Sequence, residues 1–285
     1  MSREFIAEQG WFAIVQNSPT VNYLDLALIQ AKSIKHTQKV KNYGIAVDQA
    51  TADLLTDEHW KWFDEVVLIT DDAAVKQDWK LANEGKVWHL TPWRETVKLD
   101  VDIIFPQSLD HLWSAWRQQE VCFASTVYTP WDTDANNSFS RKLFTDNNLP
   151  MAYSGITYFR YGQDSMRFFG KVADVFNNWP KYRDEVLTKC FDKEATTDVA
   201  YAIASVMCDF PTYNPILTHQ GFVHLKATVL GIGLPWEEQY AWQIDSEGRI
   251  TIDNHYQFRP LHMVNKNLKS TGFLRTYERV IENLC

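Results

Sequence analysis

The 285-residue chain has few cysteines and no long apolar run. Its four cysteines are scattered without the spacing of a metal site, so we expect reduced thiols that mostly fill the core. No apolar stretch approaches the length that a helix needs to span a bilayer. The start of the chain lacks the basic and then apolar pattern of a secretion signal. These absences predict a cytoplasmic protein without a membrane partner.

An excess of basic charge is also missing. The chain has 28 basic and 36 acidic residues and a formal charge of −8, which argues against a broad electrostatic grip on nucleic acid. A local basic groove is still compatible with this balance, because several basic residues cluster between 160 and 190. They are Arg160, Arg167, Lys171, Lys181, Arg183 and Lys189. Such clusters are most often solvated helix faces.

Glycine-rich nucleotide motifs are absent as well. The chain has neither Gly-x-Gly-x-x-Gly nor Gly-x-x-x-x-Gly-Lys, so neither a dehydrogenase nor a P-loop protein is indicated. Hydrophobic residues make up 45% of the chain, which suffices for a substantial core. No repeat, low-complexity tract or linker divides the sequence, and we expect one α/β domain over residues 1–285.

The first half alternates strand-like and helical patterns. Short apolar runs predict strands at 11–15, 43–47, 66–69 and 87–90, and helical spacing of apolar residues predicts helices at 22–35 and 49–63. Continuous apolar strands separated by helices are typical of a mainly parallel sheet covered on both faces. In such sheets ligands bind at the carboxyl ends of the strands.

The second half is less regular. We expect helices at 109–118, 163–178, 182–190, 197–207 and 273–284, strands at 120–128 and 156–159, and a hairpin over 242–252. The polar residues 129–150 are expected to form a loop.

Asp100 and Asp102 lie within the apolar-flanked segment Val97–Ile103, where we expect a buried hydrophobic strand to end. Because side chains alternate along a strand, the two carboxylates are expected on the same side. Burying two ionised carboxylates is costly unless they are paired or bind a cation. Mg²⁺ and Mn²⁺ prefer such oxygen ligands, and a metal held in this way can grip a diphosphate.

The spacing alone is weak support, because Asp132-Thr133-Asp134 has the same pattern. That second pair lies in a polar stretch, and we interpret it as a loop. The strand context of Asp100 and Asp102 favours a metal site there.

Four segments occur in a characteristic order along the chain. They are the opening strand and helix with Asn17 and Tyr23, then Arg94–Asp102, Ser154–Phe159 and Phe222–Lys226. In this order they resemble motifs of the GT-A type nucleotide-sugar glycosyltransferases, including the metal-binding DxD. The resemblance implies a GT-A fold, a twisted and mainly parallel sheet flanked by helices. It also implies a Rossmann-like nucleotide-sugar half over about 1–125 and an acceptor half over about 126–285, with a C-terminal hairpin and helix.

The resemblance implies a metal-dependent hexosyl- or pentosyltransferase that uses a nucleotide-diphosphate sugar, with a UDP-sugar favoured. Asp100, Asp102 and His224 would bind Mn²⁺ or Mg²⁺, and Asp100 could also contact the ribose and sugar. Lys226 would stabilise the charge that grows on the β-phosphate. Asp198 falls where many inverting relatives carry the base that deprotonates the acceptor. It is equally an ordinary residue of a helix N-terminus, which the helix dipole favours.

Other matched residues also have plain structural alternatives. Arg94 and Lys98 would contact the diphosphate or sugar hydroxyls, or else be surface charges at the start of a strand. Asn17 and Tyr23 match positions near the nucleotide base, although Tyr23 would serve equally in helix packing. Without the aspartate pair, His224 would be read as a core histidine.

The expected acceptor is hydroxymethylcytosine in phage DNA. The chain as a whole resembles phage-encoded transferases, some of which attach a sugar to hydroxymethylcytosine in viral DNA. The loop 129–150 and the basic residues after 160 would then face double-stranded DNA in the host cytoplasm, with the target base flipped out. The alternative is a saccharide acceptor in surface-glycan assembly.

Other function classes stay open too. Paired carboxylates also hold Mg²⁺ in nucleotidyltransferases, although no third carboxylate or phosphate loop can be placed in this sequence. A metal-binding or nucleotide-binding protein without catalysis is a further alternative.

Overall fold

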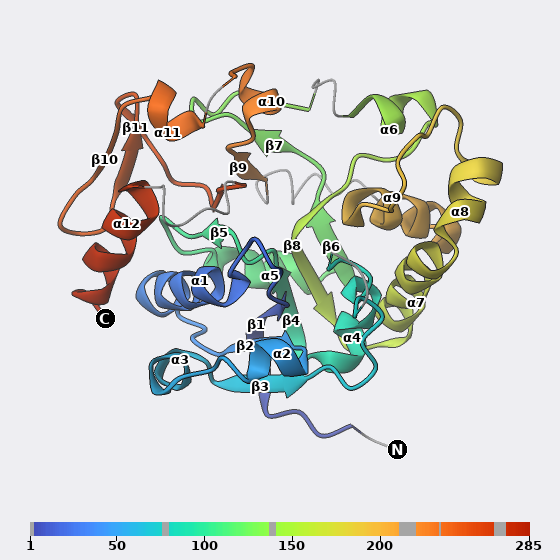
Figure 1. The fold of residues 1–285 in the computed structure, drawn as a ribbon, viewed down its shortest axis with the longest axis horizontal. Coiled ribbons are helices and arrows are strands. Elements are labelled where there is room, and N and C mark those ends of the chain that lie inside the picture. Colours follow the sequence, from blue (N-terminus) through green and yellow to red (C-terminus); the bar gives the residue numbers. More distant parts are fainter. Residues whose placement is uncertain (1–2, 76–79, 137–140, 211–220, 234, 265–271) are drawn as a thin grey trace.

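The computed structural model describes residues 3–75, 80–136, 141–210, 221–233, 235–264 and 272–285. A six-stranded central sheet has the strand order β3–β2–β1–β4–β8–β6 (Figure 1). Its strands are β1 (Ala7–Val15), β2 (Tyr43–Val47), β3 (Glu65–Leu68), β4 (Trp93–Leu99), β6 (Val121–Ala124) and β8 (Tyr153–Arg160). Strands β1 to β4 are parallel, and β8 runs antiparallel to both of its neighbours. The predicted α/β class with a mainly parallel sheet is confirmed.

Helices cover both faces of this sheet (Figure 1). One face carries α1 (Tyr23–Thr37) and α5 (Trp113–Trp116), with α12 (Gly272–Glu282) packed against α1, and the other carries α4 (Val87–Leu90), α7 (Gln163–Asn177) and α9 (Thr197–Cys208). Each face has its own buried hydrophobic cluster. Trp11 and its neighbour Phe12 belong to different clusters, because successive side chains of a strand point to opposite faces.

A second sheet forms beyond the carboxyl end of β4. Its order is β5 (Ile103–Ile104), β13 (Leu261–His262), β9 (Phe222–His224) and β7 (Val127–Tyr128). Strand β13 pairs antiparallel with β5 and parallel with β9. Since β5 follows β4 after a short turn, this sheet carries residues from distant parts of the sequence to the edge of the central sheet.

The remaining elements are short. A three-stranded sheet of β10 (Trp242–Ile244), β11 (Ile250–Ile252) and β12 (His255–Tyr256) contains the predicted hairpin. The other helical segments are α2 (Gln49–Ala52), α3 (Asp57–Trp62), η1 (Glu84–Lys86), η2 (Asp110–Leu112), α6 (Lys142–Asp146), α8 (Trp179–Lys181), η4 (Tyr182–Val186), α10 (Ala227–Leu230) and α11 (Trp236–Gln239).

Some predicted elements differ from the structure. The strand expected at 87–90 is helix α4. Its Trp88 belongs to the same buried hydrophobic cluster as the apolar residues of α7, and its indole donates a hydrogen bond to the Ser165 hydroxyl (3.0 Å). The single helix expected at 49–63 is two helices, because Asp48 and Thr56 each start a new one as N-caps. The expected strand 120–128 divides into β6 and β7, which belong to different sheets.

Other predictions were partly right. Of the helix expected at 182–190, only the π-helical segment η4 forms. The polar stretch 129–150 contains α6, and its residues 137–140 lie outside the described residues. No helix in the described ranges combines the length and apolar character needed to cross a membrane. All four cysteines lie outside disulfides, and Cys122 and Cys208 are buried in the core.

Candidate metal and substrate site

Asp100 and Asp102 lie in a turn directly after β4. The strand ends at Leu99, and the Ile103 amide closes the turn by donating to the Asp100 carbonyl (3.2 Å). The carboxylates converge because of this turn and not because of strand alternation, which corrects the reason given by the sequence. Asp102 is almost fully buried, with a side-chain exposure of 3%, whereas that of Asp100 is 32%.

Gly155 of β8 holds the turn from one side. Its carbonyl accepts a hydrogen bond from the Asp100 amide (2.9 Å). A Cβ atom at this position would lie 3.1 Å from Ile103, 3.2 Å from Phe222 and 3.4 Å from Oδ2 of Asp100. The missing side chain therefore lets the aspartate lie against β8.

Gln30 of α1 holds the turn from another side. It is fully buried, and its Nε2 donates to the carbonyls of Asp100 and Ile103, both at 2.8 Å. Its Oε1 accepts a hydrogen bond from the Tyr43 hydroxyl (2.8 Å). The sequence analysis missed Gln30, because one glutamine on a helix matches no motif.

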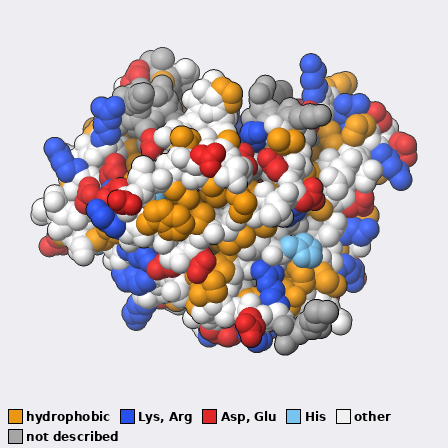
Figure 2. Space-filling model, turned by 60° about the horizontal axis from the view of Figure 1, so that its bottom comes forward, with side chains coloured by type: hydrophobic (Ala, Val, Ile, Leu, Met, Phe, Trp, Pro, Cys, Tyr) orange, Lys and Arg blue, Asp and Glu red, His pale blue; other side chains and the backbone are white. Residues whose placement is uncertain are grey.

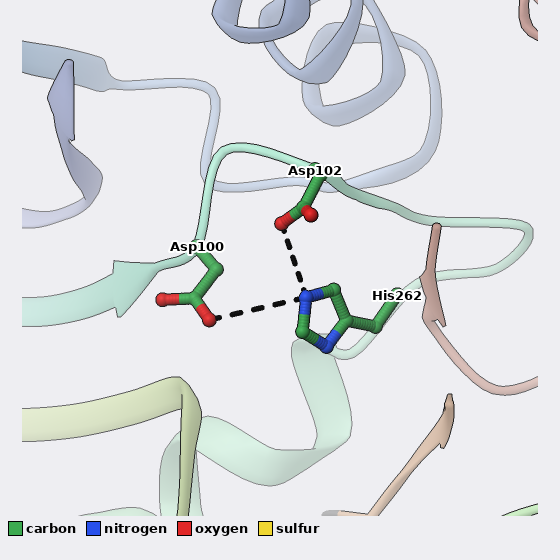
Figure 3. Close-up of side chains that lie close together, drawn as sticks. All are labelled: Asp100, Asp102 and His262. Carbon is green, nitrogen blue, oxygen red and sulfur yellow. Dashed lines mark ion pairs between the residues drawn. The ribbon is translucent and has the colours of Figure 1, made fainter. Parts of the chain in front are cut away.

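His262 completes a cluster with the two carboxylates (Figure 3). Its Nε2 lies 3.1 Å from Oδ1 of Asp102 and 4.0 Å from Oδ2 of Asp100. The Met263 amide donates to the Asp102 carbonyl (2.9 Å) and so ties β13 to the turn. One ligand atom from each side chain lies within 4.8 Å of the others. Two carboxylates and an imidazole form a donor set that fits a divalent cation.

His224, the histidine predicted as a metal ligand, lies beside this cluster. The parallel pairing of β9 and β13 sets it opposite His262, with ring centroids 4.8 Å apart. Burial, together with His262, Arg141 and Lys226, lowers the pKa of His224 well below its ordinary value, so its imidazole is neutral. The structure thus groups His262 with the carboxylates, and ligation by His224 stays a prediction.

Lys98 is fully buried beneath Asp100. Its Nζ lies 2.7 Å from Oε2 of Glu84 and 2.9 Å from Oδ1 of Asp100. Burial by itself lowers the pKa of Lys98, but the two carboxylates outweigh it and raise that pKa well above the ordinary value. Burial by itself raises the pKa of Asp100, but Lys98 and His262 outweigh it and lower that pKa. Lys98 thus forms an ion cluster with these two carboxylates, and its contact with the donor stays a prediction.

A cavity of about 520 Å³ opens over the aspartate pair, at the carboxyl ends of β1 and β4. This is the edge where the sequence placed a ligand site. Most of the predicted site residues line it. They are Tyr23, Asp100, Asp102, Asp198, His224 and Lys226.

Arg94 and Asn17 do not line this cavity. Arg94 lies near the start of β4, at the opposite end from Asp100, where it pairs with Glu8 (3.3 Å). Asn17 follows β1, and its Oδ1 accepts a hydrogen bond from the Leu24 amide at the start of α1 (3.0 Å). In this structure both side chains are held by their own neighbours.

Asp198 is fixed on the cavity wall at the N-terminus of α9. Its Oδ1 accepts hydrogen bonds from the amide and hydroxyl of Ser154, both at 2.9 Å. Its Oδ2 accepts one from the guanidinium of Arg141 (2.7 Å), which is buried over the ring of Tyr153. The role of Asp198 as a base stays a prediction.

Lys226 brings positive charge to the cavity. It follows β9 directly and is the N-cap of α10. Among the described residues, no carboxylate lies within ion-pair distance of its ammonium group. The cavity therefore combines a cluster of metal-type ligands with the positive charge of Lys226.

No family model and no curated protein matches the chain. Similar solved structures include the apo form of mouse xyloside xylosyltransferase 1, at 10% identity and a TM-score of 0.46, covering 73% of this chain and 86% of that one. The galactosyltransferase LgtC with donor and acceptor sugar analogs has 8% identity and a TM-score of 0.47, with 95% of both chains covered. The glycosyltransferase GlyE of Streptococcus pneumoniae TIGR4 has 8% identity and a TM-score of 0.46, covering 97% of this chain and 63% of that one. These likenesses concern the backbone arrangement alone.

Proposed function

We propose that the chain is a metal-dependent glycosyltransferase that moves a sugar from a nucleotide-diphosphate sugar to an acceptor hydroxyl. The observation that carries the proposal is the cluster of Asp100, Asp102 and His262 on the wall of a cavity that also holds Lys226. These three residues would hold Mn²⁺ or Mg²⁺, which when bound supplies positive charge to a diphosphate. Lys226 would stabilise the negative charge that grows on the departing nucleoside diphosphate.

The residues around the cavity suggest how the donor lies. Tyr23 lines the cavity from α1, on the side where the half over residues 1–125 would hold the nucleotide. Asp198 lines it from α9, in the half over 126–285 that would hold the acceptor. The carboxylate of Asp198 is aimed by Ser154 and Arg141, so it can accept a hydrogen bond from a sugar or acceptor hydroxyl without moving.

A nucleotidyltransferase is less well supported by this site. Such enzymes commonly use carboxylates to hold two cations about 4 Å apart. The cavity does contain a third carboxylate next to the pair, Glu84. However, Glu84 pairs with Lys98 at 2.7 Å and is not a member of the cluster of possible metal ligands formed by Asp100, Asp102 and His262.

The charge distribution favours a saccharide acceptor over double-stranded DNA. Within the basic group 160–190, Lys171 pairs with Asp174 and Arg183 with Asp184, and Arg167 donates to the Cys208 carbonyl. On the face shown in Figure 2, Lys and Arg side chains are interspersed with Asp and Glu and do not gather in one area. Binding of duplex DNA needs an accumulation of positive charge on the protein surface. We therefore propose a saccharide as the acceptor and include DNA as the alternative in the acceptor experiment below.

Donor hydrolysis tests the proposal. The purified chain is incubated with UDP-glucose, UDP-arabinose or GDP-mannose, with and without Mn²⁺, and release of the nucleoside diphosphate is measured. We expect release from at least one donor, dependent on the metal. If none of a broad panel of nucleotide sugars is turned over, the transferase proposal fails.

The acceptor is then identified by mass. Oligosaccharides and DNA with or without hydroxymethylcytosine are incubated with the active donor, and the products are examined by mass spectrometry. We expect the mass of one sugar residue to appear on a saccharide. A gain on hydroxymethylcytosine DNA alone would instead establish the phage-type acceptor.

A further inference from the structure

A buried ion cluster lies directly beneath the proposed metal site. The ammonium of Lys98 contacts Glu84 at 2.7 Å and Asp100 at 2.9 Å. The side-chain exposures of Lys98 and Glu84 are 1% and 8%. A buried charge without a partner is costly, so each of these groups depends on the others. Two of them are not metal ligands, and their burial there needs an explanation.

The local structure fixes both partners of Asp100. Lys98 lies near the end of β4, two residues before Asp100, and its ammonium donates to Oδ1 of Asp100 in the turn that follows (2.9 Å). Glu84 comes from η1, which packs tightly on α7. A Cβ atom on the neighbouring Gly85 would lie 2.6 Å from the Cα of Ala173, so only glycine allows this approach. The position of Glu84 is therefore set by the contact between two elements.

This arrangement divides the two oxygens of Asp100 between different tasks. Oδ1 accepts a hydrogen bond from Lys98, and Oδ2 is the oxygen turned toward His262. Lys98 thereby fixes the rotation of the carboxylate and leaves one oxygen for a cation. A lone ammonium in this place would also repel that cation. Burial raises the pKa of Glu84, and the Lys98 ammonium at 2.7 Å opposes this by favouring the carboxylate, whose charge cancels that of Lys98 and keeps the orienting contact without the repulsion.

We infer that Lys98 and Glu84 are positioning residues of the metal site, in which Lys98 orients Asp100 and Glu84 neutralises Lys98. The inference rests on the metal site of the proposed function. It assigns Lys98 a role different from direct contact with the donor. Residues that orient metal ligands in this way typically change metal affinity by about 10-fold to 100-fold when they are replaced.

Mn²⁺ alone is the probe for this inference. Binding to the full chain is titrated by electron paramagnetic resonance, for the wild type and for the double variant Lys98→Met with Glu84→Gln. The double variant removes one positive and one negative charge, so the net charge of the site is kept and only the orientation of Asp100 is lost. We expect the Kd for Mn²⁺ to rise about 10-fold or more and the spectrum of the bound ion to change.

A matched control comes from a second buried lysine pair. Lys32 has a side-chain exposure of 3% and pairs with Glu278 at 2.8 Å, joining α1 to α12. The double variant Lys32→Met with Glu278→Gln loses a comparable ion pair, and we expect its Kd for Mn²⁺ to equal that of the wild type. This control separates a specific effect on the site from a general loss of stability.

The outcomes distinguish failure of the proposed metal site from failure of the positioning role of Lys98 and Glu84. If the wild type does not bind Mn²⁺, the metal site of the proposed function fails and the inference fails with it. If the wild type binds and the folded Lys98–Glu84 double variant binds equally well, only the inference fails. Should that variant not fold, Glu84→Gln alone is measured. It leaves the charge of Lys98 uncancelled, so weaker Mn²⁺ binding supports the inference and an unchanged Kd overturns it.

Discussion

Two segments of the chain share the pattern Asp-x-Asp and differ in what surrounds them. Asp100 and Asp102 lie in a turn at the edge of the central sheet, where His262 joins them in a cluster of possible metal ligands. Asp132 lies in a more exposed turn, with 48% of its side chain accessible, and pairs with Arg259 at 2.7 Å. In the part of the chain that the structure describes, no group of metal-type ligands includes Asp132 or Asp134.

A buried glutamine supports the backbone at each of the two turns. Gln30 donates to two carbonyls of the first turn, whereas Gln257 donates to one carbonyl of the second, that of Pro130, and to the carbonyl of its own neighbour His255, both at 2.9 Å. Both glutamines are buried. What differs is the side chain that the later segment brings to the aspartates: an imidazole in one case and a guanidinium in the other. The partner from a distant part of the chain therefore decides the chemistry, and the spacing does not.

Asp102→Asn should have the largest effect. Asp102 is the most buried carboxylate of the cluster, and an amide loses the charge that attracts a cation. We expect Mn²⁺ binding and metal-dependent release of nucleoside diphosphate to be lost while the far-ultraviolet circular dichroism stays unchanged. Asp132→Asn, with the same chemistry at the other turn, should bind Mn²⁺ as the wild type does. Equal losses in both variants would contradict the distinction between the two segments.

Replacing each histidine should distinguish the predicted ligand from the one that the structure groups with the carboxylates. We expect His262→Ala to raise the Kd for Mn²⁺ by more than about 10-fold, because replacing even a residue that only orients a metal ligand typically weakens metal binding by that factor. His224→Ala should have a smaller effect, because His224 is one strand further from the turn. The Kd values come from the same Mn²⁺ titration. The reverse order would return the ligand role to His224.

The carboxylates could be predicted from the sequence because they come directly after an expected strand and are followed by the apolar residues Ile103, Ile104 and Phe105. Their pattern is local, and it needs only β4 to place it. His262 was missed because its strand, Leu261–His262, is too short to show any periodicity. Its place depends on pairing with β5 and β9, which lie far away along the chain. The one local sign was a histidine within the apolar segment Leu261–Val264.

In the fold as well, elements with a clear local sequence pattern were predicted, and elements that depend on distant contacts were not. Strands β1 and β2 and helices α1, α7 and α9 were predicted because each has a long or strongly apolar pattern of its own. Helix α4 was mistaken for a strand, since four apolar-rich residues fit either element and only packing against α7 decides. Lys98 was included in the predicted site because it shortly precedes Asp100, but its second partner Glu84 lies in the short 3-10 helix η1, which no sequence pattern predicts.

Gln30→Leu and Gln257→Leu form a matched pair of intermediate effect. Each removes a buried amide and leaves two backbone carbonyls without their donor, and a buried group left unsatisfied costs about 1–3 kcal/mol. We expect urea unfolding to show a lower free energy of unfolding for both variants. Only Gln30→Leu should also weaken Mn²⁺ binding, because only that glutamine holds the turn of Asp100. Weaker binding in the Gln257 variant would mean that overall stability, and not this turn, controls the site.

The ion pair of the second segment should contribute least. Asp132 has a φ of 58°, a left-handed conformation that asparagine tolerates as well as aspartate does, so Asp132→Asn removes the charge and keeps the turn. Exposed pairs of this kind contribute about 0–1 kcal/mol. Arg259→Met should cost more in urea unfolding, because the guanidinium also lies 3.8 Å from the ring centroid of Tyr128. If Asp132→Asn proves the more costly of the two, the carboxylate itself has a role in the second segment that its pairing with Arg259 does not explain.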